Sequence, residues 1–377
     1  MPALSEQASK GVFFHARDLP ADPAARDLIF LKVLGSPDPY GRQLDGLGGG
    51  VSSLSKAVIV GPPTRADTDV DYTFGQVAVD RPLVDWGANC GNLSSVIGPF
   101  AVDEGLVTVA DGEALVRVHQ TNSRKIIHAR FAVRGGKAET EGDFVLAGVA
   151  GSGARIRLDF LDPGGTVTPG LLPTGHVVDR VTIPGFGAVD MSLVDATNPV
   201  AFVRASDVGM TGVEAPDAIE ARPDLMALLD TLRRHAGVRM GLGATPEAIG
   251  LANPKIAVVG APAAFRTLDR TAVAAEAHEI GVRMLSMERA HRAVTLTGAM
   301  CLGVACRIDE TIPNQLAARP ARADEIRVGN PSGVVSVGGE VRHAGRWIAD
   351  SAVVYRTARR LMQGAVAVPA ALMPRAA

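Results

Sequence analysis

Two short segments that are apolar around nearly their whole circumference constrain the fold of this chain most strongly. They cover residues 92–104 and 297–308, are rich in small side chains, and open from the glycine-containing turns Cys90-Gly91-Asn92 and Thr297-Gly298-Ala299. A helix that is apolar on every face is a buried helix. The sequence therefore predicts one buried helix in each half of the chain.

Short strands are expected around these helices. The chain has 42 glycines and 24 prolines among its 377 residues, and clusters of them interrupt runs that are rich in β-branched side chains. Apolar and polar residues alternate roughly along these runs, which is typical of strands. We predict strands at residues 58–60, 70–79, 115–120, 126–133, 144–149 and 154–160.

Three further segments have apolar positions at helical intervals. We predict helices over residues 24–34, 217–236 and 273–287, and Gly237 as the stop signal of the second. Both halves thus combine β-rich sequence with a buried helix, which predicts an α/β (α+β) fold of two similar domains. We place them at residues 1–182 and 183–377, packed closely around a cleft.

The composition excludes several classes of protein. Lys and Arg number 38 and Asp and Glu 40, a net charge of −2, and no basic block is present, so we expect no nucleic-acid partner. No run approaches the roughly 18 apolar residues of a membrane span. The N-terminus lacks the pattern of a signal peptide, and three cysteines are too few for a disulfide framework. We therefore predict a cytoplasmic protein.

The motif Asn89-Cys90-Gly91-Asn92 places a thiol at the start of the first buried helix. Free backbone N–H groups and the helix dipole at that position stabilise a thiolate and also attract carboxylates. Gly91 would let a ligand approach the backbone closely. The alternative is that Cys90 is a small buried hydrophobic side chain.

A glycine-rich loop at residues 46–50 leads through a serine-rich turn to Lys56. It is not a phosphate-binding Walker loop, because Ser55 precedes Lys56 and Ala57 follows it. A lysine that begins an apolar run can be partly desolvated, which lowers its pKa and makes it a usable base. The alternative is a surface lysine at the end of a strand.

Other chemistry-bearing residues point to structural roles. Cys301 and Cys306 lie five residues apart with no histidine at ligand spacing, so we predict core positions and no metal site. His235 and His291 are single histidines, and the sequence has neither a Gly-x-Ser-x-Gly elbow nor a Rossmann fingerprint. Hydrolase and dinucleotide-dependent chemistry are therefore not expected.

Motifs along the chain from about Ser9 to Val368 together resemble those of the PrpF family, the 2-methylaconitate cis-trans isomerases and their relatives that act on methylitaconate and 4-oxalomesaconate. The matching motifs are Gly35-Ser36-Pro37-Asp38-Pro39-Tyr40, Gln43-Leu44-Asp45-Gly46, Gly48-Gly49, Ser53-Leu54-Ser55-Lys56, Asp71-Tyr72-Thr73-Phe74-Gly75-Gln76-Val77, Asp85-Trp86, Asn89-Cys90-Gly91-Asn92, Pro173-Thr174-Gly175, Arg239-Met240-Gly241, Ser286-Met287, His291, Thr297-Gly298 and Asn330-Pro331-Ser332-Gly333.

The resemblance implies a diaminopimelate epimerase-like fold, in which two similar domains each wrap a curved sheet around a central helix and the active site lies in the cleft. It implies no metal and no organic cofactor. It also implies that Lys56 and Cys90 are the acid–base pair for proton transfer at carbon in a small-molecule polycarboxylate. A homodimer is the assembly to test.

The resemblance further implies a set of substrate-binding residues drawn from both halves of the chain. They are Ser9, Lys10, Gly11, Gly49, Ser53, Ser55, Asn89, Gly91, Asn92, Met240, His291, Thr297, Gly298 and Ser332.

One departure from the family and two rival functions stay open. The family usually carries Met-Arg-Gly-Gly-Thr before Ser9-Lys10-Gly11, where this chain has Leu4-Ser5-Glu6-Gln7-Ala8. The change removes an arginine and two glycines and predicts a shortened first strand, another substrate or weakened activity. The rivals are an amino-acid epimerase, which requires a second cysteine opposite Cys90, and a non-catalytic anion-binding accessory protein.

Overall fold

The computed structural model describes residues 9–87, 90–146, 149–183, 185–286, 289–319 and 324–369. Those within Glu6–Leu158 and Arg356–Ala377 form one compact unit, here called the N-terminal unit, and those within Asp159–Tyr355 form the C-terminal unit. The change of unit falls inside strand β8 (Ile156–Leu161), earlier than residue 182, and again at the end of strand β19 (Trp347–Arg356). The N-terminal unit is therefore built from two separate parts of the chain.

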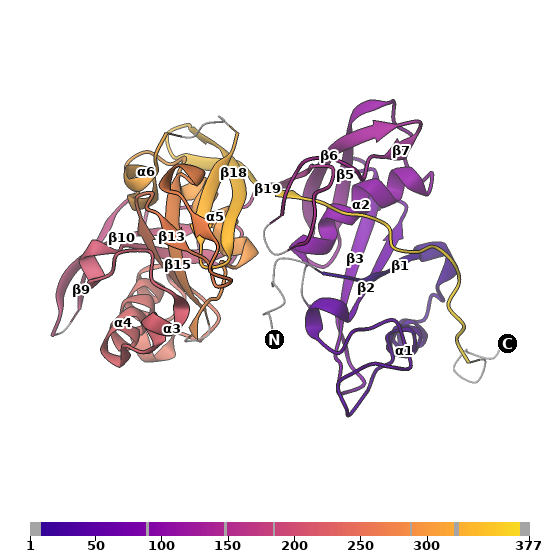
Figure 1. Cartoon of the computed structure of the whole chain (residues 1–377), viewed down its shortest axis with the longest axis horizontal. Coiled ribbons are helices and arrows are strands. Elements are labelled where there is room, and N and C mark those ends of the chain that lie inside the picture. Colours follow the sequence, from indigo (N-terminus) through magenta and orange to yellow (C-terminus); the bar gives the residue numbers. More distant parts are fainter. Residues whose placement is uncertain are drawn as a thin grey trace. The chain divides into compact units, whose positions relative to one another are not determined.

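The sheet of the N-terminal unit follows a simple order. Strand β1 pairs parallel with β2, β2 antiparallel with β3, β3 parallel with β5, and β5 antiparallel with β6. The strands and helices of this unit are β1 (Val12–His15), α1 (Pro23–Leu34), β2 (Lys56–Gly61), β3 (Val70–Val77), β4 (Val84–Asp85), α2 (Gly91–Asp103), β5 (Gly112–Gln120), β6 (Lys125–Arg134) and β7 (Lys137–Ala138). Helix α2 packs against β5, β6 and β7 (Figure 1).

The C-terminal unit repeats this order. Strand β11 pairs parallel with β12, β12 antiparallel with β15, β15 parallel with β17, and β17 antiparallel with β18. Its elements are β9 (Asp179–Ile183), β10 (Gly187–Asp195), β11 (Pro199–Arg204), α3 (Pro216–Glu220), α4 (Pro223–Arg239), β12 (Lys255–Gly260), β13 (Phe265–Arg266), β14 (Ala272–Val273), β15 (Ile280–Ser286), β16 (Arg289–Ala290), α5 (Leu296–Ala305), α6 (Ile312–Leu316), β17 (Ile326–Asn330), β18 (Gly333–His343) and β19. The predicted mixed α/β fold is confirmed.

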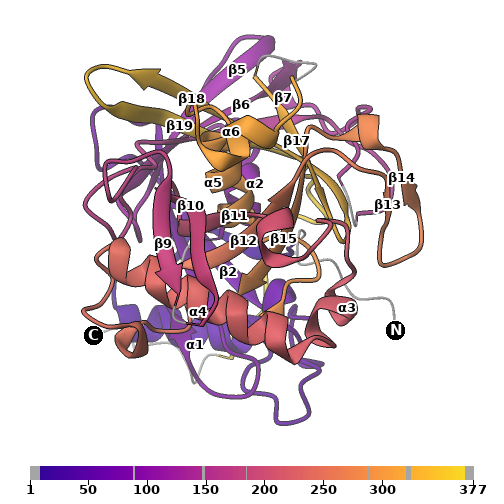
Figure 2. The ribbon, with the colours of Figure 1, turned by 90° about the vertical axis from the view of Figure 1, so that its left-hand side faces the viewer.

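Helices α2 and α5 occupy corresponding places in the two units, and both are largely buried, as predicted. Their small residues allow close approach to the sheet. A Cβ atom at Gly98 would lie 2.6 Å from the Phe131 ring, and one at Gly303 would lie 3.1 Å from the backbone nitrogen of Gly338. Helix α5 contacts β10, β11 and β18, whereas α4 crosses the strands of the same unit and contacts β9 and β12 (Figure 2).

The helix predicted over residues 217–236 is two helices in the structure. The chain breaks between α3 and α4 because Pro223 cannot continue the preceding helix, and it instead occupies the first turn of α4. Gly237 does not stop α4, which runs to Arg239. A Cβ atom at Gly237 would lie 2.9 Å from Ile249, so this glycine serves close packing.

The prediction of a helix over residues 273–287 is wrong. In this region β14 ends at Val273, a single 3-10 turn covers Ala275–Ala277, and β15 follows. Strand β15 lies between β12 and β17, and its residues from Ile280 to Leu285 are all buried. A strand covered on both faces has no alternating pattern, which explains the misassignment.

The strand predicted over residues 144–149 is also not formed in the part that the structure describes, where Phe144 makes only an isolated bridge to Gly153. The other predicted strands correspond to β2, β3, β5, β6 and β8, and the helix over residues 24–34 is α1. Strand β1 has four residues, and the predicted shortening of the first strand concerns residues 4–8, which lie outside the described residues.

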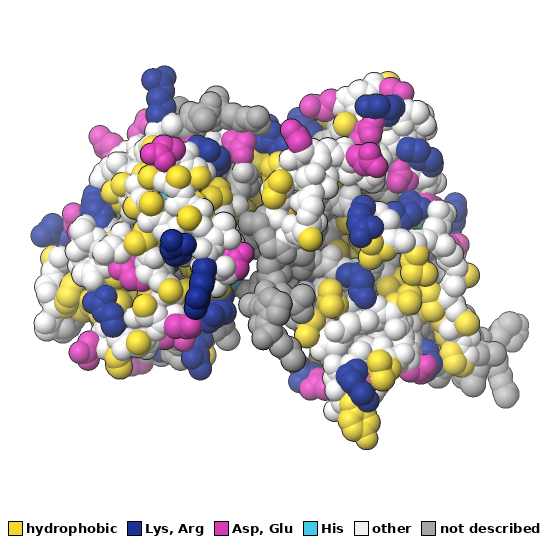
Figure 3. Space-filling view, viewed as in Figure 1, with side chains coloured by type: hydrophobic (Ala, Val, Ile, Leu, Met, Phe, Trp, Pro, Cys, Tyr) yellow, Lys and Arg dark blue, Asp and Glu magenta, His cyan; other side chains and the backbone are white. Residues whose placement is uncertain are grey.

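Within the described residues, no helix has the length and apolar character needed to cross a membrane. Acidic and basic side chains are interspersed on the face of both units seen in Figure 3, in keeping with a net charge of −2.

Candidate active site

Lys56 begins strand β2 and is buried, with only 9% of its surface exposed. Its Nζ atom donates to the Cys90 Sγ atom at 3.2 Å and to the Ser9 Oγ atom at 3.1 Å. It also lies 5.7 Å from the centre of the Phe74 ring. The structure thus excludes a surface lysine and brings together the two residues predicted to transfer protons.

Cys90 is the N-cap residue of α2 and is 6% exposed. Its backbone carbonyl accepts hydrogen bonds from the Tyr72 hydroxyl at 3.3 Å and the Ser94 hydroxyl at 3.0 Å. Burial, and then negative charge on Cys90, raise the pKa of Tyr72, so this hydroxyl stays a donor. Among the described residues the Cys90 side chain makes no capping hydrogen bond, so its thiol is left to contact Lys56.

The residues just before β1 lie against this pair. The Asn92 side chain donates to Ser9 Oγ at 3.4 Å, and the backbone N–H of Lys10 donates to the Ser53 carbonyl at 3.0 Å. A Cβ atom at Gly11 would lie 3.2 Å from the Lys56 carbonyl and 2.8 Å from the Leu93 side chain. The structure therefore gathers Ser9, Lys10, Gly11, Ser53, Gly91 and Asn92 around Lys56 and Cys90.

The glycine-rich loop is built around Gln43, which sequence reasoning did not select as a site residue. Its side-chain oxygen accepts hydrogen bonds from the backbone N–H groups of Gly49 and Gly50, both at 3.0 Å. Its side-chain nitrogen donates to Ser55 Oγ at 2.7 Å, next to Lys56. Gln43 is 1% exposed, and it fixes both the loop and the start of β2.

Arg356 is a second residue that sequence reasoning missed. Its Nε atom donates to Asn92 Oδ1 at 3.3 Å, and the residue is 2% exposed. Burial lowers the pKa of Arg356 to about 10, and negative charge on Cys90 opposes that shift. In the sequence Arg356 follows an apolar stretch and Lys56 precedes one, but this pattern does not reveal the contact with Asn92.

In the C-terminal unit, four predicted residues lie around the loop that leads into α5. The His291 Nδ1 atom accepts from the backbone N–H of Ala293 at 3.1 Å, and Ser332 Oγ donates to the Arg292 carbonyl at 2.7 Å. Thr297 and Gly298 form the first turn of the helix. Met240 is the C-cap residue that follows α4 and, at 1% exposure, belongs to the apolar core.

Two parts of the prediction lie outside the described residues. These are Asn89 in the Cys90 motif and the departure from the family at residues 4–8.

Cys301 and Cys306 are buried, as predicted for core positions. The Cys301 thiol donates to the Val194 carbonyl at 3.5 Å, and burial raises the pKa of Cys306 to about 12. Thiols in such surroundings stay protonated and unreactive. In the described parts of the chain, no cluster of three or more His, Cys, Asp and Glu side chains is arranged to hold a metal ion.

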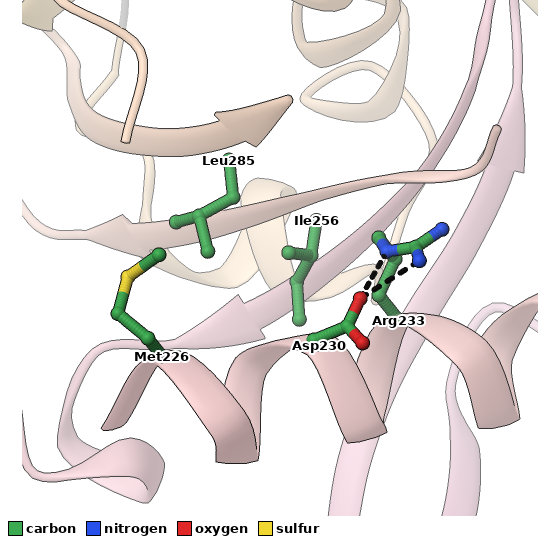
Figure 4. Close-up of a pocket in the computed structure, with 5 residues that line it drawn as sticks. All are labelled: Met226, Asp230, Arg233, Ile256 and Leu285. Atoms are coloured by element: carbon green, nitrogen blue, oxygen red, sulfur yellow. Dashed lines mark hydrogen bonds and ion pairs between the residues drawn. The ribbon is translucent and has the colours of Figure 1, made fainter. Parts of the chain in front are cut away.

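The C-terminal unit has a cavity of about 190 Å³ whose lining includes none of the predicted site residues. Met226, Asp230 and Arg233 of α4 line it together with Ile256 of β12 and Leu285 of β15 (Figure 4). Its two charged groups pair with each other, since Arg233 Nε donates to Asp230 at 2.8 Å.

The fold is that of an isomerase of known structure. The chain superposes on the crystal structure of methylitaconate-delta-isomerase with a TM-score of 0.89, at 40% sequence identity, covering 94% of this chain and 92% of the other. The chain belongs to the PrpF protein family, whose model matches residues 3–369.

Two relatives of similar length agree with this assignment. The 2-methyl-aconitate isomerase of Shewanella oneidensis is 40% identical over 379 residues, covering 96% of this chain and 94% of the relative. The 3-methylitaconate isomerase of Eubacterium barkeri is 40% identical over 364 residues with the same coverage. The chain is thus an enzyme of the isomerase class.

Proposed function

We propose that this chain isomerises an unsaturated di- or tricarboxylate of the 2-methylaconitate type, with Lys56 and Cys90 as its acid–base pair. The observation that carries the proposal is the distance of 3.2 Å between Lys56 Nζ and Cys90 Sγ, two titratable groups that are both buried. Titratable groups held within hydrogen-bond distance in a buried site are suited to proton transfer.

The reaction needs only a proton donor and a proton acceptor. The member of the pair that is deprotonated removes a proton from a substrate carbon, and the electron pair of the broken C–H bond delocalises into the adjoining double bond and carboxylate. The protonated member then returns a proton to the same or the allylic carbon. The number of protons is unchanged and no co-reactant is consumed. General acid–base catalysis of this kind contributes about 10²–10⁴-fold.

The charge that develops on the substrate requires electrostatic stabilisation. The positive end of the α2 helix dipole, at Gly91 and Asn92, and the side chain of Lys10 would attract substrate carboxylates. Gly49, Ser53 and Ser55 shape the neighbouring loop. Substrate contacts from Met240, His291, Thr297, Gly298 and Ser332 remain predictions.

A screen by NMR in deuterated water tests this function. Wild-type protein is incubated with 2-methylaconitate, aconitate, methylitaconate or 4-oxalomesaconate. We expect deuterium uptake at carbon, together with conversion, for one of the four. Folded protein that labels none of them, but labels the α-carbon of proline or another amino acid, would contradict the proposal and favour an epimerase. Binding of a carboxylate without label uptake would favour an accessory protein.

We further propose that the enzyme works in the cytoplasm. The three cysteines are free and buried, which suits a reducing compartment.

A further inference from the structure

The most informative group outside the predicted set is Arg356, because a chain of contacts links it to the proposed acid–base pair. Arg356 Nε donates to Asn92 Oδ1 at 3.3 Å, and Asn92 Nδ2 donates to Ser9 Oγ at 3.4 Å. Ser9 Oγ in turn accepts from Lys56 Nζ at 3.1 Å. The orientation of Asn92 and Ser9 therefore depends on a guanidinium that comes from the far end of the sequence.

The charges in this region support a functional role. Lys56 and Arg356 are both buried, at 9% and 2% exposure, and Cys90 beside them is 6% exposed. Burial lowers the pKa of Arg356, and negative charge on Cys90 opposes that shift, so the two groups interact electrostatically. Both cations would attract a bound substrate carboxylate.

Arg356 also keeps its charge when Lys56 gives up a proton. Its guanidinium, with a pKa of about 10, stays protonated at neutral pH. Its positive charge therefore remains next to Asn92 whichever member of the proposed pair holds the proton.

We propose that Arg356 is a positioning residue that holds Asn92 and Ser9 in place beside Lys56 and supplies a fixed positive charge to the site of Cys90. This inference deepens the proposed function and rests on it.

The path of the chain explains how Arg356 reaches this place. The Tyr355 hydroxyl donates to Asp324 at 3.0 Å within the C-terminal unit, whereas Arg356 is the first residue to return to the N-terminal unit. Four residues later, Arg360 pairs with Glu104 at 2.5 Å and with Asp103 at 3.7 Å, at the end of α2. The segment after β19 thus passes along α2 from its start to its end (Figure 1).

Arg360 provides a matched control, since it is an arginine of the same segment whose ion pairs lie at the opposite end of α2. The variants to compare are Arg356→Gln, Arg356→Lys and Arg360→Gln. The first readout is the rate of Cys90 alkylation by iodoacetamide between pH 5 and 10, located by mass spectrometry. The second is kcat and KM on the substrate found by the NMR screen.

We expect Arg356→Gln to raise the pH midpoint of Cys90 alkylation by about one unit or more, as loss of a neighbouring opposite charge does. It should lower kcat about tenfold or more, with KM changed less than about threefold. Arg356→Lys should restore the midpoint, and Arg360→Gln should match wild type in both readouts. An alkylation profile of Arg356→Gln that overlays wild type would overturn the assignment.

Asn92→Ala provides a second test in case the Arg356→Gln variant does not fold. It breaks the same chain of contacts but keeps the buried charge, so we expect a lower kcat with little change in the alkylation midpoint. If Asn92→Ala keeps the wild-type kcat, the positioning role is refuted. Alkylation requires no substrate, so a shifted midpoint in protein that turns over none of the carboxylates would reject the proposed function and keep the role of Arg356.

Discussion

The two units of this protein share one topology but differ at two corresponding positions. Strand β2 begins with Lys56 and strand β12 begins with Lys255, and the N-cap residues of α2 and α5 are Cys90 and Thr295. In the C-terminal unit both residues have structural partners. Thr295 accepts the Gly298 N–H at 3.2 Å, and Lys255 donates to the Ala252 carbonyl at 3.3 Å. In the N-terminal unit the lysine donates to the cysteine.

This difference shows that the same position in the shared topology can stabilise a helix in one unit and provide a reactive group in the other. The threonine at the start of α5 satisfies a backbone donor of its own helix, as capping residues do. Among the described residues the cysteine at the start of α2 makes no such capping bond, so its thiol remains for chemistry. We infer that Cys90 at the N-cap of α2 provides a proton-transfer group and does not stabilise the helix as a capping side chain would.

The largest expected effect is a difference in turnover between substitutions of Lys56 and Lys255. Lys56→Met should lower turnover at least ~10²–10⁴-fold, because it removes one partner of the proposed acid–base pair. Lys255→Met, at the corresponding position of β12, should keep wild-type turnover. Steady-state rates on the substrate from the NMR screen check both. Comparable losses in the two variants would mean that the comparison between the units does not locate the chemistry.

A second test compares the reactivity of Cys90 with that of Cys301 and Cys306. Burial raises the pKa of Cys306 to about 12, and the pKa of Cys301 is raised by burial as well. At pH 8 about one Cys306 thiol in 10⁴ is then ionised. We expect iodoacetamide to modify Cys90 at least ~100-fold faster than either of them. Peptide mapping by mass spectrometry measures this, and equal labelling of Cys90 and Cys306 would remove the distinction between α2 and α5.

Gly11→Ala tests the packing that holds the Ser9 region against Lys56. The added Cβ atom would lie 2.8 Å from Leu93 and 3.2 Å from the Lys56 carbonyl, so we expect a loss of about 1–3 kcal/mol in unfolding free energy, together with reduced turnover. Gly250→Ala in the C-terminal unit is the control, because a Cβ atom added there would have no described atom of another segment within 4 Å. Urea unfolding compares them, and a fully stable, fully active Gly11→Ala would argue against this arrangement.

The smallest effects test capping directly. Thr295→Ala should destabilise the protein by about 1 kcal/mol, since it removes the capping oxygen of α5. Cys90→Ser introduces a strong N-cap residue at α2, so it should leave stability unchanged or raise it by about 0.5–1 kcal/mol while it abolishes turnover. Thermal unfolding measures both, and destabilisation of similar size in the two variants would show that Cys90 already acts as a structural cap.

Local features of the sequence predict the mixed α/β fold and its two buried helices. The two buried helices can be predicted because small apolar residues cover every face of both. Strand β15 cannot, since it is covered on both faces and so lacks the alternation that marks a half-buried strand. Gly237 resembles a stop signal in the sequence, because its packing against Ile249 depends on tertiary contacts.

The site is predictable in part. Cys90 can be chosen from its turn, but its pairing with Lys56 comes from family resemblance, because these residues lie 34 positions apart. Gln43 and Arg356 were missed since their roles depend on contacts that a single sequence does not reveal. The contact between Arg356 and Asn92 spans 264 positions.

The most direct test of the central claim is solvent deuterium incorporation into the substrate carbon, followed by NMR for wild type, Lys56→Met, Cys90→Ser and Cys306→Ser at equal concentrations. If Lys56 and Cys90 transfer the proton, wild type and Cys306→Ser will incorporate label, whereas Lys56→Met and Cys90→Ser will incorporate none above the uncatalysed background. Label uptake at the wild-type rate in both Lys56→Met and Cys90→Ser would contradict the claim.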